Sequence, residues 1–274
     1  MRKFKMLIVM GSLVASLTTA GLATAAPGAS AAAEEAVHHA AARPVASSGA
    51  PKIKSPHAEV ANAVTGSDLW SQGADTEVPM GSITKVMTAY VVIEAGNLNR
   101  LITVPSGITA YDQEYGASTA GLQPGQQLTA EQLLYAMLVP SGCDAAYTLA
   151  QAYGSGLSAF IAKMNQTAAQ LGLTSTYFTD FSGLPDPTET STYSDAQDLV
   201  TLGRDAMQLP LFASIVGSTS YSIPAVTGEH PAFTWSTTSP LFGEGQSALP
   251  TQAYDGPTAA GRALTPGGSV PFSA

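Results

Sequence analysis

One lysine inside an otherwise uncharged, apolar stretch constrains the fold of this chain more than any other feature. Across residues 83–93, apolar side chains recur at the spacing of an α-helix, and Lys85 is the one side chain there with a formal charge. The predicted helix is apolar on nearly every side, which indicates that the protein buries it. A lysine is costly to bury, so its presence indicates that an amine is needed at this position.

Ser82 stands three residues before Lys85, so the two side chains are neighbours on one side of the predicted helix. Ser82 also opens that helix, where free backbone N–H groups favour developing negative charge. A serine hydroxyl needs an adjacent base to become a nucleophile, and an unprotonated amine in apolar surroundings can be that base. The spacing alone also fits an ordinary N-cap and a surface lysine, because a chain of this length holds about one such pair by chance.

The rest of the pattern predicts short strands at both ends of a helical middle. A hairpin is predicted to turn at Gly66-Ser67, and strands are predicted at residues 221–226 and 233–235. The polar segment 110–127 carries no predicted helix. The predicted helices run from a Thr129–Gln132 capping box to Pro140, over residues 144–153, over residues 157–171 up to Gly172, and from a Ser194–Gln197 capping box to about residue 207. This order predicts a sheet with an inserted all-helical lobe.

The N-terminal residues 1–25 have the pattern of a secretory signal peptide. Arg2, Lys3 and Lys5 precede an uncharged stretch of apolar and small residues, and Ala23-Thr24-Ala25 is a cleavage signal. We expect cleavage to leave no stable membrane anchor; a retained anchor is the alternative. Residues 26–56 are rich in Ala, Pro and Ser and predict a disordered linker. The mature protein is therefore expected to be secreted, outside the cytoplasm.

Charge and cysteine content exclude several classes of site and partner. The formal net charge of −9 becomes −12 when the three basic residues of the signal peptide are removed, which disfavours nucleic acid as a partner. Cys143 is the only cysteine, so no internal disulfide can form. His38-His39 lies in the linker without an acidic or cysteine cluster, so we expect no metal and no cofactor.

A family resemblance rests on several motifs in a fixed order. The stretch Pro79-Met80-Gly81-Ser82-Ile83-Thr84-Lys85-Val86-Met87-Thr88-Ala89 resembles the active-site helix of the serine D-alanyl-D-alanine carboxypeptidases, which are relatives of the penicillin-binding proteins and class A β-lactamases. Ser141-Gly142-Cys143 resembles the second catalytic motif. Leu122-Gln123-Pro124-Gly125 and Phe181-Ser182-Gly183-Leu184 also match. The similarity covers roughly residues 58–242.

The resemblance implies a β-lactamase/transpeptidase-like fold of the α+β type, in which helices flank an antiparallel sheet, with a catalytic domain over residues 57–242. It implies a cell-wall-associated enzyme that removes the terminal D-Ala from peptidoglycan stem peptides and that β-lactams inhibit covalently. Ser82 would attack the peptide carbonyl, Lys85 would take its proton, and Ser141 would relay the proton to the leaving D-Ala. Cys143 stands where the family usually has a substrate-binding Asn.

Each of the last two residues has an alternative interpretation. Ser141 also fits an N-cap, with Asp144 closing a capping box. Cys143 fits a buried structural thiol equally well, because a thiol is a weak donor and acceptor.

The C-terminal part departs from the family pattern. The family has Lys-Thr-Gly, or His or Arg in place of Lys, on a strand beside the site, and no cation followed by Thr-Gly occurs after Ser141. Its expected position lies near Thr251-Gln252-Ala253. Residues 243–274 predict an irregular tail in place of the family's last strands and helix, as in a truncated or frameshifted gene product. Losing the carboxylate contact costs ~1.5–3 kcal/mol and losing the second oxyanion N–H costs ~3–4 kcal/mol, which predicts a roughly 10³- to 10⁵-fold loss of activity.

Two other functions therefore remain open. The missing third motif favours a non-catalytic, peptidoglycan- or penicillin-binding pseudoenzyme. A class A β-lactamase would need a glutamate that activates the deacylating water. Glu189 lies in the corresponding region, but the segment Glu189-Thr190-Ser191-Thr192-Tyr193 does not resemble that family's pattern.

Overall fold

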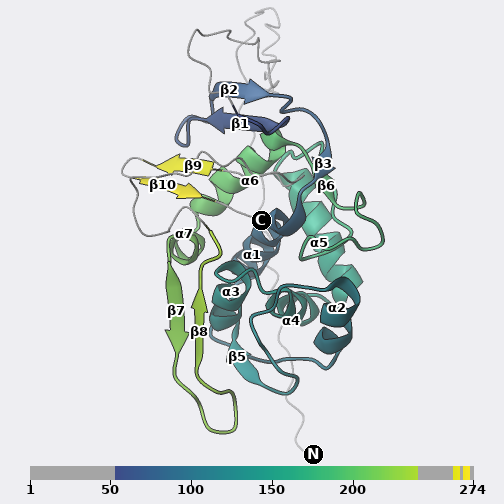
Figure 1. The fold of residues 1–274 in the computed structure, drawn as a ribbon, viewed down its shortest axis with the longest axis vertical. Helices are drawn as coiled ribbons and strands as arrows, with labels where there is room; N and C mark the ends of the chain where they lie inside the picture. Colours follow the sequence, from purple (N-terminus) through teal and green to yellow (C-terminus); the bar gives the residue numbers. More distant parts are fainter. Residues whose placement is uncertain (1–52, 240–261, 266–267, 272–274) are drawn as a thin grey trace, which may run out of the picture. The chain divides into compact units, whose positions relative to one another are not determined.

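A computed structural model describes residues 53–239, 262–265 and 268–271 (Figure 1). The predicted signal peptide, the linker up to residue 52 and the expected third-motif position at residues 251–253 lie outside these ranges. The elements are β1 (Ala58–Ala61), β2 (Asp68–Gln72), β3 (Val78–Pro79), η1 (Gly81–Ile83), α1 (Thr84–Ala95), β4 (Leu101–Thr103), α2 (Gly107–Tyr115), β5 (Gln127–Thr129), α3 (Ala130–Leu138), α4 (Cys143–Tyr153), α5 (Leu157–Gln170), β6 (Tyr193–Ser194), α6 (Ala196–Met207), α7 (Pro210–Val216), β7 (Ser220–Ile223), β8 (Phe233–Ser236), β9 (Arg262–Thr265) and β10 (Gly268–Pro271).

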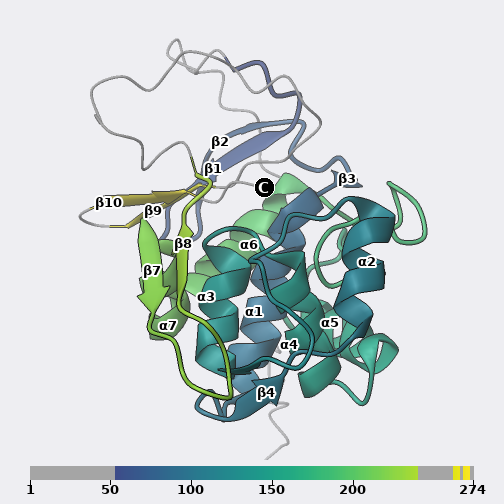
Figure 2. The same ribbon diagram turned by 60° about the horizontal axis from the view of Figure 1, so that its bottom comes forward.

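Helix α1 is the centre of the described core. It packs against α3, α4, α5, α6 and α7, and Figure 2 shows it enclosed by its neighbours. Its buried residues lie on all sides of the helix, from Thr84 and Lys85 to Val92. The prediction of a buried helix is confirmed, and the helical turn η1 places its start at Gly81, beside Ser82.

The capping signals in the sequence succeed at α3 and fail at α6. Thr129 and Gln132 form the predicted reciprocal capping box of α3. At α6 the predicted cap, Ser194, is wrong by one residue. The Asp195 carboxylate accepts the hydrogen bond of the Asp198 N–H at 2.8 Å, while the Ser194 hydroxyl lies 2.7 Å from that of Thr176. An ionised carboxylate is the stronger acceptor at a positive helix end, which explains the choice.

Helix α2 begins at Gly107 and runs into the polar segment 110–127, for which no helix is predicted. Only two of its side chains, Ile108 and Tyr111, are buried, and they stand three residues apart on one face. Its last turn ends at Gly116 in the left-handed conformation, with φ of +58°. A helix with so narrow an apolar face leaves little periodic signal in the sequence.

The strands pair in twos, all antiparallel: β1 with β2, β3 with β6, β4 with β5, β7 with β8, and β9 with β10. The predicted hairpin at Gly66 and the predicted strands near Tyr221 and Phe233 are confirmed. The mixed α/β class is confirmed as well, although the sheets are smaller than the predicted one. Within the predicted, mostly irregular tail, the described residues form the antiparallel pair β9–β10.

The β7–β8 hairpin lies against α3 through stacked aromatic rings. The ring centroids of Tyr135 on α3 and Tyr221 on β7 are 3.6 Å apart, and Trp235 on β8 stacks beyond Tyr221. The Trp235 indole N–H also donates to the Ala120 carbonyl at 2.8 Å. These contacts fix the chain segment that follows β8, which forms part of the cleft described below.

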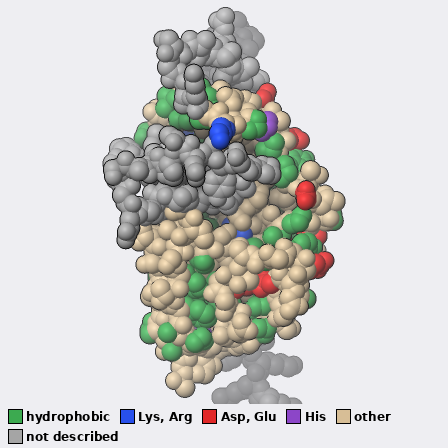
Figure 3. Space-filling model, in the orientation of Figure 1, with side chains coloured by type: hydrophobic (Ala, Val, Ile, Leu, Met, Phe, Trp, Pro, Cys, Tyr) green, Lys and Arg blue, Asp and Glu red, His purple; other side chains and the backbone are tan. Residues whose placement is uncertain are grey.

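Charged side chains are sparse on the face shown in Figure 3, and the acidic ones gather toward its right-hand side. No helix among the described residues is long and apolar enough to cross a membrane.

Candidate active site

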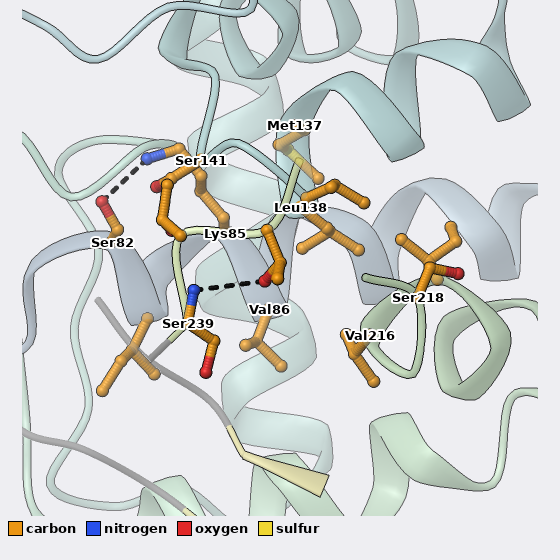
Figure 4. A pocket seen from close by; sticks show the side chains of 14 residues that line it. Ser82, Lys85, Val86, Met137, Leu138, Ser141, Val216, Ser218 and Ser239 are labelled. Atoms are coloured by element: carbon orange, nitrogen blue, oxygen red, sulfur yellow. Dashed lines mark hydrogen bonds between the residues drawn. The ribbon is translucent and has the colours of Figure 1, made fainter. Parts of the chain in front are cut away.

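Ser82 and Lys85 lie within hydrogen-bonding distance of each other at the start of α1. The Lys85 Nζ atom and the Ser82 Oγ atom are hydrogen-bonded at 3.0 Å (Figure 4). Gly81, with φ of +55°, turns the chain into η1. Met80, the residue before Gly81, is fully buried and anchors this turn. The structure therefore brings together the pair that the helical spacing predicts.

Lys85 is buried, with 2% of its surface exposed. Besides Ser82, its amine contacts the Ser182 carbonyl oxygen at 2.8 Å. The amine thus lies between two oxygen atoms, shielded from water. The predicted burial of a lysine in this helix is confirmed.

Ser82, Lys85 and Ser141 line one open cleft, which encloses about 580 Å³ including the solvent at its mouth. Its other walls come from the end of α3, from α7 and from the segment after β8. The lining residues are Ser82, Ile83, Lys85, Val86, Met137, Leu138, Val139, Ser141, Ile215, Val216, Ser218, Thr237, Thr238 and Ser239.

Ser141 is not an N-cap, so that alternative interpretation is wrong. Helix α4 is capped by Gly142 without any side-chain hydrogen bond. Ser141 instead has a positive φ of +63°, a conformation that costs a non-glycine residue about 1–2 kcal/mol. The Ser118 hydroxyl donates to the Ser141 carbonyl at 2.6 Å and helps to hold this conformation. Such backbone strain is typical of functional sites.

The Asp144 carboxylate supports the turn at Ser141, which we call the Ser141 corner, from inside the protein. It is fully buried and accepts the N–H groups of Ala120, Leu122 and Ala145, each at about 2.9 Å. Burial raises the pKa of Asp144, and these N–H groups act in the opposite direction. Asp144 therefore ties the loop before β5 to the start of α4, rather than closing a capping box with Ser141.

Cys143 is buried behind this corner. Its backbone N–H donates to the Ser118 carbonyl at 2.8 Å, and its sulfur lies 3.7 Å from the Ser118 hydroxyl. The thiol does not line the cleft, unlike the side chain of Ser141.

Behind Lys85 lies a polar group to which sequence reasoning assigns no role: Tyr111, Asp180 and Ser182. The Tyr111 hydroxyl donates to the Asp180 carboxylate at 2.6 Å and lies 2.7 Å from the Ser182 hydroxyl. Burial raises the pKa of the Tyr111 phenol, and the charge of Asp180 adds to the rise, so the phenol keeps its proton. The one sequence signal for this group is the matching segment Phe181-Ser182-Gly183-Leu184.

The described residues offer no site for a metal ion, because they contain no cluster of three or more His, Cys, Asp or Glu side chains that could hold one.

Comparison with known proteins agrees with the geometry. The profile of the D-alanyl-D-alanine carboxypeptidase family matches residues 44–245. A D-alanyl-D-alanine carboxypeptidase of Streptomyces sp. (strain K15) is 36% identical over 206 residues, which cover 71% of this chain and 70% of that protein. The D-alanyl-D-alanine carboxypeptidase DacB2 of Mycobacterium tuberculosis is 39% identical over 170 residues, which cover 62% of this chain and 56% of that protein.

Solved structures agree as well. The crystal structure of the Streptomyces K15 DD-transpeptidase is similar with a TM-score of 0.69 and 34% identity, over 81% of this chain and 90% of that one. The predicted family and fold are thereby confirmed: this chain belongs to the D-alanyl-D-alanine carboxypeptidase family.

Proposed function

We propose that this chain is a serine-type D-Ala-D-Ala carboxypeptidase that removes the terminal D-Ala from peptidoglycan stem peptides through an acyl-enzyme on Ser82. One observation carries the proposal: the buried amine of Lys85 lies 3.0 Å from the Ser82 hydroxyl at the wall of an open cleft. A hydroxyl beside an amine base is the arrangement that nucleophilic catalysis by serine requires. Family membership agrees with this reaction.

In the acylation step, the Ser82 oxygen attacks the carbonyl carbon of the penultimate D-Ala while its proton passes to the Lys85 amine. The helical turn at Ser82 favours the developing oxyanion, and the Ser82 N–H supplies one hydrogen bond to it. The Ser141 hydroxyl then donates a proton to the leaving nitrogen and regains one from the Lys85 ammonium. The C–N bond breaks, D-Ala leaves, and water later hydrolyses the ester on Ser82.

As far as residue 239, the wall of the cleft after β8 offers hydroxyl groups and no cation. Thr237, Thr238 and Ser239 line it, and the Thr238 N–H contacts the Val139 carbonyl at 3.4 Å. Since no cation followed by Thr-Gly occurs after Ser141, we expect acylation roughly 10³- to 10⁵-fold slower than in a family member with that motif. This absence is the one observation that favours the second candidate, a peptidoglycan- or penicillin-binding pseudoenzyme. Cys143 could reach substrate only after a local rearrangement, because its thiol does not line the cleft.

A class A β-lactamase is not favoured. Glu189, the one glutamate in the corresponding region, is exposed and does not line the cleft. The described residues that line the cleft include no carboxylate. Without a carboxylate beside the acyl-enzyme, deacylation of a penicillin adduct is slow, so β-lactams act as covalent inhibitors.

The substrate and the N-terminal pattern together support an extracytoplasmic location. Peptidoglycan lies outside the cytoplasmic membrane, and residues 1–25 resemble a cleavable signal peptide. The proposed division of the chain is a signal peptide, a linker over residues 26–56, a catalytic domain over residues 57–242 and a tail.

The test is covalent labelling with fluorescent penicillin, followed by mass spectrometry of the labelled peptide and by measurement of D-Ala release from a D-Ala-D-Ala peptide. Ser82→Ala should abolish labelling, whereas Ser158→Ala, at an exposed position on α5, should keep it. Circular dichroism confirms that each variant is folded. A folded wild-type protein that takes no label and releases no D-Ala would overturn the proposal in favour of the pseudoenzyme, and repeated turnover of nitrocefin would establish a β-lactamase.

A further inference from the structure

A loop of five residues, 180–184, is tied together by one buried carboxylate; we call it the Asp180 loop. The Asp180 Oδ1 atom accepts the N–H groups of Ser182 at 2.7 Å, of Gly183, and of Leu184 at 3.0 Å. Its Oδ2 atom accepts the Tyr111 hydroxyl at 2.6 Å. Asp180 and Ser182 are fully buried, so these bonds are shielded from water.

The Asp180 loop presents two successive carbonyl groups to α1. The Phe181 oxygen accepts the Thr88 hydroxyl at 2.6 Å, and the Ser182 oxygen accepts the Lys85 amine at 2.8 Å. The next residue, Gly183, lies flat against the backbone of Gly81, with no room for a β-carbon between them. The position of the Ser182 carbonyl relative to Lys85 is therefore set by the same loop that contacts the turn before Ser82.

We infer that Asp180 and Tyr111 are positioning residues for acylation, which fix the Ser182 carbonyl so that it directs the Lys85 amine toward Ser82. The inference rests on the proposed function of Ser82 and Lys85. Neither Asp180 nor Tyr111 lines the cleft, so they act through the Ser182 carbonyl and not on the substrate.

The geometry of the amine explains the effect. An unprotonated lysine has two N–H donors and one lone pair, so a carbonyl that holds one N–H leaves the lone pair to be directed at the Ser82 hydroxyl. When the proton has moved, Lys85 is an ammonium, and its hydrogen bond to the Ser182 carbonyl becomes charge-assisted and stronger. The contact therefore stabilises the transition state more than the resting enzyme, which is the requirement for an increase in rate.

Tyr111 offers the mildest way to disturb the loop. Tyr111→Phe removes only the hydroxyl and keeps the ring, which packs against the rings of Tyr115, Tyr147 and Phe181. The matched control is Tyr153→Phe, which likewise removes the hydroxyl of a buried tyrosine; the Tyr153 hydroxyl donates to the Gly96 carbonyl at 3.0 Å. Gly96 follows the other end of α1, away from Ser82.

The experiment measures penicillin acylation in full-length mature protein over a range of penicillin concentrations. It separates the limiting acylation rate from the concentration that gives half of it. For Tyr111→Phe we expect the limiting rate to fall about tenfold or more, with the half-saturating concentration within about twofold of wild type. Tyr153→Phe should keep both values, even if it lowers the melting temperature as much as Tyr111→Phe does. A limiting rate of Tyr111→Phe within twofold of wild type would overturn the inference.

A second variant keeps the test decisive if Tyr111→Phe does not fold. Ser182→Ala keeps the backbone carbonyl and removes only the hydroxyl, which lies 3.1 Å from Asp180 and 2.7 Å from the Tyr111 oxygen. Its limiting rate should fall about threefold or more, again without a change in half-saturation; an unchanged rate overturns the inference. If wild type itself takes no label on Ser82, the proposed function fails instead, so the two failures are distinguishable.

Discussion

Gly183 and Gly81 lie in direct backbone contact, and a β-carbon on Gly183 would overlap the carbonyl group of Gly81. Gly81 opens the helical turn that carries Ser82, so the contact joins the Asp180 loop to the turn of the proposed nucleophile. Gly183 also has a positive φ of +88°, which side chains rarely adopt. Two independent constraints thus require glycine at this position.

Gly183→Ala should displace the Ser82 turn and slow penicillin acylation at least about 100-fold, because small displacements in an active site have large effects on rate. The control is Gly172→Ala, where φ is +73° and nothing lies within 4 Å of the added carbon. That variant should lose only the ~1–2 kcal/mol of a left-handed backbone and keep the wild-type acylation rate. Stopped-flow labelling and thermal melting check both values. Equal acylation rates in the two variants would show that the overlap is harmless.

Lys85→Met tests whether the lysine serves the reaction rather than the fold. Methionine has nearly the same length and no charge to bury, so the variant should fold with an unfolding free energy within about 1 kcal/mol of wild type. The relief of burying an amine offsets the two lost hydrogen bonds, to Ser82 and to the Ser182 carbonyl. Penicillin labelling should fall at least about 10³-fold, since Ser82 loses its base. A large loss of stability in urea unfolding would instead indicate a structural lysine.

The sequence predicts the centre of this site well because its signals are local. The spacing of Ser82 and Lys85 and the apolar residues around them depend on one helix alone, and that helix forms as expected. The Thr129 cap is equally local. Family motifs then extend the prediction to Ser141, which does reach the same cleft.

The parts that could not be predicted depend on contacts between distant segments. Asp180 and Tyr111 are 69 residues apart, and nothing in either local pattern indicates their hydrogen bond. Ser141 was also open to interpretation as a cap. A serine with an acidic residue three positions later fits a capping box. The Asp144 side chain instead accepts the backbone N–H groups of Ala120 and Leu122 in another segment and of Ala145 in its own helix.

Asp144→Asn tests this carboxylate. An amide has one acceptor oxygen where Asp144 has two, and its NH2 group would face a backbone N–H. The Ala120 N–H contacts both oxygens and keeps one, but either the Leu122 N–H or the Ala145 N–H would then lack its acceptor, at about 1–3 kcal/mol. We expect an unfolding free energy lower by about 2–4 kcal/mol and reduced labelling of Ser82, because the corner that carries Ser141 loosens. Asp75→Asn, at an exposed position, is the control and should change neither. Unaltered urea unfolding of Asp144→Asn would show that the carboxylate is dispensable.

Glu59 predicts a pH dependence of stability away from the cleft. Burial raises the pKa of Glu59 to about 8, and the neighbouring carboxylates of Asp68 and Asp195 add to the rise. The unfolded chain has an ordinary glutamate pKa near 4.3, so between about pH 4.5 and pH 8 the folded protein binds more protons than the unfolded one.

The contribution of Glu59 to the unfolding free energy is therefore fully present at low pH and is lost as the pH rises toward 8. One oxygen of Glu59 is buried without a hydrogen-bond partner, which agrees with a carboxyl group that stays protonated. Glu59→Gln keeps the shape and cannot ionise, so its unfolding free energy should fall less steeply than that of wild type between pH 5 and pH 8. Asp112, whose pKa burial raises to about 6, contributes a slope of the same sign in both proteins and cancels in the comparison. Urea unfolding at several pH values measures the difference, and parallel curves for the two proteins would show that Glu59 is ionised in the folded state.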